Sequence, residues 1–197
     1  MPTGAPAGRG LRDLAVSKPM PDIRGSVSDG AWDYSDVAVH FVDDYRSMHL
    51  TMRSMLLAMR IRDFSCFSDP RDSIKRMEIR IPDLIITDYY MSPVDGIKFA
   101  RMIRKESACI DEFVPILLLT GYATSSLVER ARDSGINGVL AKPLSIKLLY
   151  RRISAIIEEN RPFIQGQEYF GPDRRRKERI FDGADKRMAN LELHTVV

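Results

Sequence analysis

The chain has 197 residues, of which 44% are hydrophobic and 29% charged, and a formal net charge of +3. This composition is typical of a globular protein, and the length supports one well-packed domain with extensions rather than two full domains. No stretch approaches the roughly 18 apolar residues of a membrane-spanning helix, and the start of the chain lacks the apolar segment of a secretion signal. We therefore expect a cytoplasmic protein without a membrane span.

The chain changes character at about residue 36. Residues 1–35 are rich in Gly, Pro, Ser and Asp without apolar periodicity, which predicts a flexible N-terminal extension. From 36 to 160, short apolar runs alternate with segments whose apolar residues recur at helical spacing. The predicted strands are 37–42, 63–68, 84–87, 114–120 and 138–141, and the helices that follow them contain Met48 to Met59, the segment from Pro70, Phe99 to Ile103, the segment from Ser126, and Ile146 to Ile156.

Two of these helices have recognisable starts. Asp69-Pro70 predicts an aspartate N-cap followed by proline in the first turn. Ser126-x-x-Glu129 matches a capping box, in which Ser126 would be the N-cap of the fourth helix.

Five alternating strand–helix units predict an α/β fold, a parallel sheet with helices on both faces. The third and fourth strands are continuously apolar, as expected of strands buried on both sides. The segment 63–68 alternates apolar and polar residues, which favours an edge strand.

Residues 161–197 are too few for an ordinary domain, and we expect a basic C-terminal tail without a recognisable output domain. The sequence DRRRKER in this tail could bind nucleic acid or anionic lipid. A solvated or self-docking tail is the simpler interpretation, because acidic residues interleave the basic ones. Tyr169 and Phe170 could anchor the tail to the domain.

Charged and polar residues follow four of the predicted strands. Asp43 and Asp44 follow the first strand, Asp88 the third, and Lys142 the fifth, while Thr120 ends the fourth. Because parallel strands present their carboxyl ends at one edge of the sheet, where ligands bind, we expect these side chains to converge.

The convergence of these groups predicts phosphoryl-transfer chemistry. Three neighbouring carboxylates repel one another, and a hard divalent cation with oxygen ligands, Mg²⁺, would neutralise them. Lys142 would add positive charge for a phosphoryl group, to which Thr120 could donate a hydrogen bond. Asp88 could be the nucleophile, since aspartyl phosphates are a known covalent route.

Residues 36–160 resemble the receiver domain of two-component response regulators. The resemblance rests on the FVDD acid pair, the ITD aspartate, the DxxM…DG loop, the LLLT threonine and the AKP lysine–proline, in this order and at strand ends. It implies a flavodoxin-like sheet of order 2-1-3-4-5 with five helices.

The resemblance also implies a role for each residue. Asp88 would be the phosphoacceptor, Asp44 a direct Mg²⁺ ligand and Asp43 a ligand acting through water. The backbone carbonyl of Tyr90 would be a further metal ligand. Thr120 and Lys142 would bind the phosphoryl group, and the peptide bond before Pro143 would be cis.

The sequence departs from the family pattern at two places. Ser92 separates Met91 from Pro93 in the acceptor loop, and Val139 stands where many receivers have an aromatic switch residue. The phosphorylated state would then be read by another device, for which Tyr122 is a candidate. Tyr90 and Tyr122 could shield an aspartyl phosphate from water, or they could be packed surface aromatics.

The sequence therefore predicts a stand-alone response regulator, a signalling protein rather than an enzyme. A sensor histidine kinase or phosphotransfer protein would phosphorylate it. It would signal through a downstream protein target or a phosphorelay, and it could form a homodimer. A haloacid-dehalogenase-like hydrolase is disfavoured because such enzymes need a second aspartate at the position of Tyr90. The alternative is a transcriptional or membrane-associated regulator acting through the tail; nucleic acid is the less favoured partner.

The remaining reactive side chains receive structural interpretations. Cys66 and Cys109 have no metal-ligand spacing, so we expect free, buried thiols. We expect His40 to be a hydrogen-bonded core histidine rather than a pH sensor. His49 and His194 show no partner pattern.

Overall fold

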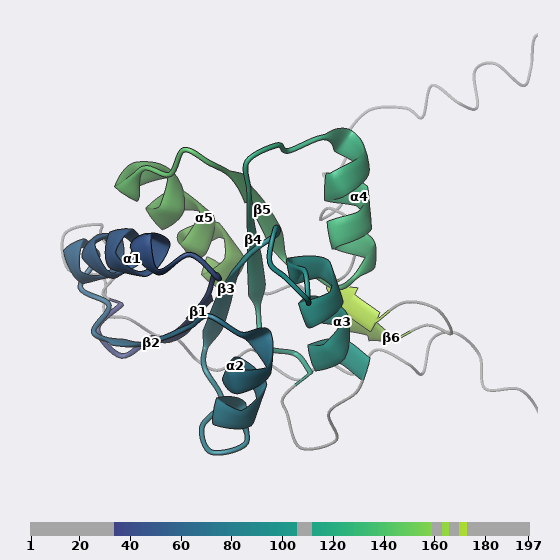
Figure 1. Ribbon diagram of the computed structural model, residues 1–197, viewed down its shortest axis with the longest axis horizontal. Helices are drawn as coiled ribbons and strands as arrows, with labels where there is room; N and C mark the ends of the chain where they lie inside the picture. Colours follow the sequence, from purple (N-terminus) through teal and green to yellow (C-terminus); the bar gives the residue numbers. More distant parts are fainter. Residues whose placement is uncertain (1–33, 106–111, 159–162, 166–169, 173–197) are drawn as a thin grey trace, which may run out of the picture.

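The computed structural model describes residues 34–105, 112–158, 163–165 and 170–172. Its centre is a five-stranded parallel sheet in the order β2-β1-β3-β4-β5 (Figure 1). The predicted strand order is confirmed. The strands are β1 (Ala38–Val42), β2 (Asp63–Phe67), β3 (Leu84–Asp88), β4 (Ile116–Thr120) and β5 (Gly138–Ala141).

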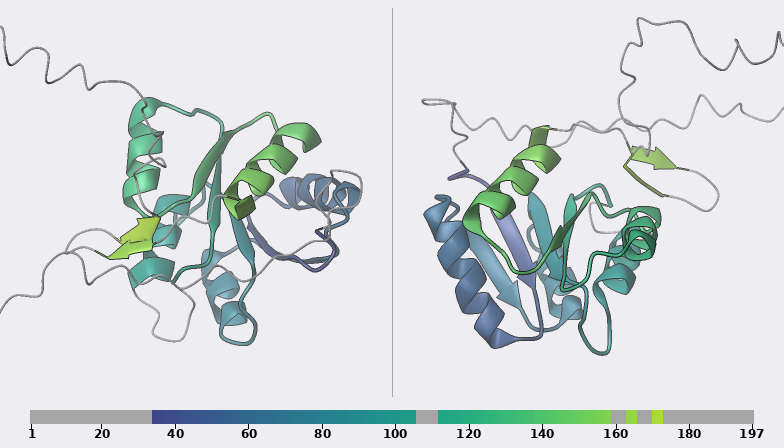
Figure 2. Two further views of the ribbon diagram at one scale, coloured as in Figure 1. Left: turned by 180° about the vertical axis from the view of Figure 1, so that it is seen from behind. Right: turned by 90° about the horizontal axis from the view of Figure 1, so that it is seen from above.

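Helices cover both faces of the sheet, as the strand–helix alternation predicted. Helices α1 and α5 lie on one face, and α2, α3 and α4 lie on the other (Figures 1 and 2). Their bounds are α1 (Arg46–Ala58), α2 (Pro70–Met77), α3 (Gly96–Lys105), α4 (Ser125–Asp133) and α5 (Ile146–Glu158). None of the helices in these described segments has the length and apolar content needed to span a membrane.

The three central strands are buried along their whole length, whereas β2 is half-buried at every position. This difference follows from position, because β1, β3 and β4 have neighbours on both sides and helices on both faces. The predicted edge strand is therefore confirmed.

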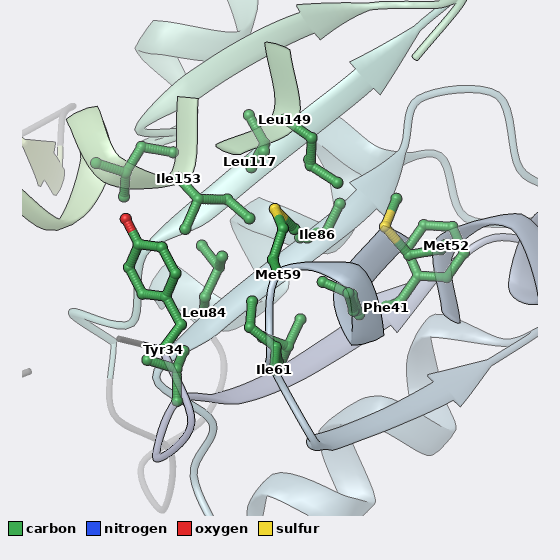
Figure 3. Packing of buried hydrophobic residues seen from close by; sticks show 14 of the residues in the cluster. Tyr34, Phe41, Met52, Met59, Ile61, Leu84, Ile86, Leu117, Leu149 and Ile153 are labelled. Atoms are coloured by element: carbon green, nitrogen blue, oxygen red, sulfur yellow. The ribbon is translucent and has the colours of Figure 1, made fainter. Parts of the chain in front are cut away.

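The core between the sheet, α1 and α5 begins earlier in the chain than predicted (Figure 3). Tyr34, which the sequence placed in the flexible extension, is 1% exposed. Its hydroxyl lies 2.6 Å from the Ser154 hydroxyl on α5, and its ring packs edge-on against Tyr150. A buried aromatic ring with a hydrogen-bonded hydroxyl anchors the chain, so Tyr34 is part of the packed domain.

The core on the other face contains a buried arginine. Arg104 on α3 is 3% exposed and donates hydrogen bonds to the backbone carbonyls of Glu112, Val114 and Gly135. A buried guanidinium is tolerated only when its donors are satisfied. These bonds tie α3 to the segment that enters β4 and to the turn that follows α4.

One of the two predicted helix starts is wrong. Asp69 caps α2, accepting a hydrogen bond from the Arg71 amide, as predicted. The N-cap of α4 is Thr124 rather than Ser126, because the extended Thr124 backbone lets its hydroxyl accept from the Leu127 amide at 3.3 Å. Ser126 lies inside the first turn of α4, so the capping-box pattern does not mark the start of this helix.

His40 is a core residue, as predicted. It is 6% exposed, its Nδ1 lies 3.0 Å from the Ser73 hydroxyl, and its ring packs against Phe67. Burial and the positive charge of Arg76 lower the pKa of His40 to about 4, so the ring is neutral at neutral pH. It is therefore a structural partner of α2 and not a sensor of physiological pH.

Cys66 is free and half-buried on β2, and burial raises the pKa of its thiol. Cys109 and His194 lie outside the described residues.

The segment predicted as a tail contains an antiparallel pair of short strands. Strand β6 (Phe163–Gln165) pairs with β7 (Phe170–Pro172), and both Gly171 and Pro172 are buried. These strands of three residues are too short to give an alternation pattern, which is why the sequence did not reveal them. Tyr169 and the DRRRKER segment lie outside the described residues.

Candidate functional site

The sheet register brings the predicted site residues to one edge. Asp88 is the last residue of β3 and pairs with Leu119, and Thr120 at the end of β4 pairs with Ala141. The amide of Lys142 continues the β4–β5 ladder by donating to the Thr120 carbonyl at 2.7 Å. The amide of Asp43 donates in the same way to β2 at 3.0 Å. Each side chain is thus placed by the strand that precedes it.

Lys142 joins two carboxylates at this edge. Its Nζ lies 2.8 Å from Asp88 Oδ1 and 3.3 Å from Asp43 Oδ2. The carboxylate side chains are 7% and 0% exposed, against 26% for Lys142. Two buried carboxylates therefore share one partly exposed ammonium group.

These contacts and burial shift two pKa values. Burial alone would lower the pKa of Lys142, but the hydrogen bond and charge of Asp88, together with the charge of Asp43, outweigh it and raise this pKa. Burial raises the pKa of Asp43, an effect that the Tyr45 amide and Lys142 only partly offset. Lys142 is therefore positively charged at neutral pH, and it supplies the local charge that the two carboxylates need.

The loop after Asp88 folds back onto β3. Asp88 Oδ2 accepts from the Tyr90 amide at 3.0 Å, and the Gly96 amide donates to the Tyr89 carbonyl at 3.1 Å. Asp95 then opens α3, its Oδ1 accepting from the Lys98 amide at 2.8 Å. A Cβ atom on Gly96 would lie 2.3 Å from the Asp88 carbonyl oxygen, so this close approach requires glycine.

The loop contains a cis peptide bond that the sequence did not predict, between Ser92 and Pro93. The Lys142–Pro143 bond, which the resemblance implied to be cis, is also cis.

The Thr120 hydroxyl makes no hydrogen bond to Asp88 in this structure. Its side chain is fully buried, and its Oγ1 accepts from the Tyr122 amide at 3.2 Å and donates to the Tyr122 carbonyl at 3.3 Å. The hydroxyl predicted to bind a phosphoryl group is thus bound to the backbone of its own loop.

Tyr90, Tyr122 and Val139, the residues considered for shielding or switching, occupy two environments. Tyr90 and Tyr122 are 62% and 77% exposed, so both rings stand at the surface of the site edge. The Tyr90 ring packs edge-on against Tyr89 at a centroid distance of 4.5 Å. Val139 is half-buried and packs into the core beneath α3 and α4.

The oxygen groups at this edge suit a hard cation in kind. Asp44 is exposed, and its carboxylate makes no hydrogen bond or ion pair with the residues that the structure describes. The backbone carbonyl of Tyr90 accepts no backbone hydrogen bond from the residues that the structure describes. Over the described segments, however, no three His, Cys, Asp or Glu side chains already stand close enough together to hold a metal ion. Chemically the groups fit Mg²⁺, which keeps several water ligands and needs few protein ligands.

His49 is a site contact that the sequence interpretation missed. Its Nε2 lies 2.6 Å from the backbone carbonyl oxygen of Asp43, and its ring packs edge-on against Phe41. A lone histidine on a helix gives no pattern, and its place in the first turn after the acid pair was the only available signal.

Comparison with known families agrees with this arrangement. The family model of the response regulator receiver domain matches residues 39–154. The chain belongs to this family. It is a receiver of two-component signalling, whose fold and site edge are those described above.

The chain is also similar in sequence to several curated proteins. The chain is 28% identical to the probable chemotaxis protein CheY of Rhizobium etli over 61% of this chain and 92% of that protein. It is 36% identical to the transcriptional regulatory protein PdtaR of Mycobacterium tuberculosis over 47% of this chain and 43% of that protein. It is 28% identical to the cyclic di-GMP phosphodiesterase response regulator RpfG of Xanthomonas campestris, over 66% of this chain and 35% of that protein. The match to PdtaR and RpfG thus covers less than half of each protein.

Solved receiver structures share the fold. The chemotaxis protein CheY4 of Vibrio cholerae aligns with a TM-score of 0.56 at 24% identity, over 61% of this chain and 98% of that one. The receiver domain of the sensor histidine kinase PA1611 from Pseudomonas aeruginosa aligns with a TM-score of 0.55 at 25% identity, over 62% of this chain and 98% of that one. The PA1611 structure has a magnesium ion coordinated in its active-site cleft.

Proposed function

We propose that this receiver accepts a phosphoryl group on the carboxylate of Asp88. The observation that supports this most strongly is the contact of 2.8 Å between Asp88 Oδ1 and Lys142 Nζ at the carboxyl edge of the sheet. A buried carboxylate, the proposed nucleophile, thus lies beside a positive charge, which favours transfer of an anionic phosphoryl group. The proposed donor is a phosphohistidine on a sensor kinase or phosphotransfer protein.

In the transfer step, a carboxylate oxygen of Asp88 forms a bond to phosphorus as the phosphorus–nitrogen bond of the donor breaks. The electron pair of that bond stays on the imidazole nitrogen of the donor. Lys142 neutralises negative charge on the phosphoryl oxygens, and the Tyr90 amide holds the other oxygen of Asp88 in place. Thr120 donates to a phosphoryl oxygen after its hydroxyl leaves the Tyr122 backbone.

The groups proposed to hold Mg²⁺ are the carboxylates of Asp43, Asp44 and Asp88 and the backbone carbonyl of Tyr90. Asp44 is the proposed direct ligand, because it is exposed and has no partner within the described segments. Asp43 is already held by Lys142 and is proposed to act through water. When bound, the ion supplies Lewis-acid charge to the phosphoryl oxygens. The magnesium in the PA1611 receiver supports this assignment by similarity.

Acetyl phosphate, a small phosphoryl donor, tests the proposal without a partner protein. With Mg²⁺ present, the intact mass of the protein is expected to rise by one phosphoryl group. Chelating the metal with EDTA is expected to abolish this gain, because the phosphoryl oxygens then lack the charge of the cation. A protein that gains no mass with Mg²⁺ contradicts phosphoryl acceptance, and a gain unchanged in EDTA contradicts the metal.

Signalling would pass from residues 36–160, the proposed receiver domain, to a protein partner. Phosphorylation biases an equilibrium between two conformations, and a partner reads the difference. Because the switch position holds Val139, we propose that the loop carrying Tyr122 and the start of α4 report the phosphorylated state. That loop contains the hydrogen bonds that Thr120 must release.

Tyr90 is proposed to lengthen the life of the aspartyl phosphate. Its ring is held at the edge of the site by Tyr89, where it can limit the approach of water. A Tyr90→Asn protein, once phosphorylated and freed of donor, is expected to lose its phosphoryl mass several-fold faster than wild type.

The matched control for this prediction is Ile79→Asn. Ile79 is 76% exposed and lies between α2 and the start of β3, away from the carboxyl ends of the strands. Its replacement should therefore leave the rate of phosphoryl loss unchanged. Equal decay of Tyr90→Asn and wild type would show that the ring is only a surface aromatic.

A further inference from the structure

Helix α1 begins without the usual N-terminal capping groups. Its N-cap, Tyr45, makes no side-chain capping bond, and the first turn contains no acidic residue. The Tyr45 amide donates instead to Asp43 Oδ1 at 2.9 Å. The start of α1 is thus hydrogen-bonded to Asp43, so the position of α1 affects the position of the acid pair.

His49 supplies a second attachment between α1 and the acid pair. Its Nε2 lies 2.6 Å from the Asp43 carbonyl oxygen. Because a carbonyl oxygen can only accept, Nε2 must carry the proton and donate it. The ring is oriented by the edge-on contact with Phe41, which is fully buried in β1. A short bond from an oriented ring holds its acceptor in one position.

The held carbonyl belongs to the peptide group that joins Asp43 to Asp44. The Asp43 amide bonds to β2, its carboxylate bonds to Tyr45 and Lys142, and its carbonyl bonds to His49. All polar groups of Asp43 are therefore engaged. A peptide group is planar, so fixing the Asp43 carbonyl also fixes the positions of the amide nitrogen and Cα atom of Asp44.

We propose that His49 is a positioning residue for the divalent cation: its bond to the Asp43 carbonyl preorients the carboxylate of Asp44. The inference rests on the proposed metal site and adds a residue to it. Asp44 is exposed and has no partner of its own among the described residues, so the backbone restraint is what limits the positions its carboxylate can take. Without that restraint, the Asp44 peptide must be ordered when the cation binds. This ordering costs conformational entropy, so the affinity for the cation falls.

Magnesium titration by calorimetry on the full chain, without a phosphoryl donor, tests the proposal. His49→Leu removes the donor while keeping an apolar side chain against Phe41, and it is expected to weaken Mg²⁺ binding about tenfold. His49→Gln keeps an N–H donor at a similar reach and is expected to restore affinity to within about twofold of wild type. Leu50→Ala, at a neighbouring α1 position 69% exposed, is the control and should bind as wild type does.

A second measurement separates positioning from general destabilisation. At saturating Mg²⁺, His49→Leu is expected to be phosphorylated by acetyl phosphate at the wild-type rate, with only the Mg²⁺ concentration for half-maximal rate raised. Thermal unfolding in EDTA establishes that each variant is folded at the temperature of titration. If the leucine protein does not fold, His49→Met provides the same comparison with an unbranched side chain.

The outcomes distinguish this inference from the metal site on which it rests. Wild-type affinity in His49→Leu, or equal loss in His49→Leu and His49→Gln, would overturn the positioning role. Asp44→Asn is expected to abolish binding. Wild-type affinity in Asp44→Asn would instead overturn the proposed metal site itself.

Discussion

An Asp88→Asn protein is expected to gain no phosphoryl mass from acetyl phosphate and Mg²⁺. An amide oxygen is a poor nucleophile, and it carries no charge to attract the cation or to pair with Lys142. The change is nearly isosteric, so the amide oxygen can still accept from the Tyr90 amide. Intact-mass measurement over the time in which wild type is fully modified checks this prediction.

Asp95→Asn is the matched control for this experiment. Asp95 lies in the same loop, but its carboxylate caps α3 through the Lys98 amide, and asparagine caps helices equally well. This protein should be modified as wild type is. An undiminished mass gain in Asp88→Asn would show that phosphorylation takes place on another residue.

A Gly96→Ala protein is expected to lose about 1–3 kcal/mol of its free energy of unfolding. The added Cβ would lie 2.3 Å from the Asp88 carbonyl oxygen and 2.6 Å from Leu118 Cδ1. The leucine side chain can move, but the carbonyl belongs to the central strand β3, so relief requires backbone displacement. Asp88, the proposed acceptor, would move with it, so the proposed phosphorylation should slow as well.

Gly121→Ala provides the matched control in the neighbouring loop. A Cβ on Gly121 would meet no atom within 4 Å, so this change should alter stability little. Urea unfolding of both proteins measures the difference. A loss below about 1 kcal/mol in Gly96→Ala would mean that the acceptor loop has more freedom than its close approach to β3 indicates.

The strands and the edge strand could be predicted from the apolar pattern, whereas the strand order was implied by the resemblance to receiver domains. Continuously apolar runs mark β3 and β4, and the alternation in 63–67 marks the edge strand. Parallel topology then forces Asp88, Thr120 and Lys142 to one edge, as the register shows. These features depend on patterns spread over many residues, which single exceptions do not disturb.

Contacts that depend on one side-chain rotamer or one hydrogen bond could not be predicted. Thr124 and Ser126 are both good caps, and only the backbone path decides between them. The Tyr34–Ser154 bond and the His49–Asp43 bond join residues with no common pattern. The sequence identified Thr120 as a site residue, but not that its hydroxyl is engaged by Tyr122.

The engagement of Thr120 has a consequence for the protein before any phosphorylation. Its two bonds to the Tyr122 backbone are neutral, and each contributes about 0.5–1.5 kcal/mol net. Tyr122 is 77% exposed, whereas Thr120 is fully buried. Counting these bonds alone, their release costs about 2 kcal/mol, which corresponds to a released population of a few per cent at most. If phosphorylation acts through the released state, as proposed above, it would enlarge a population that the unphosphorylated protein already contains.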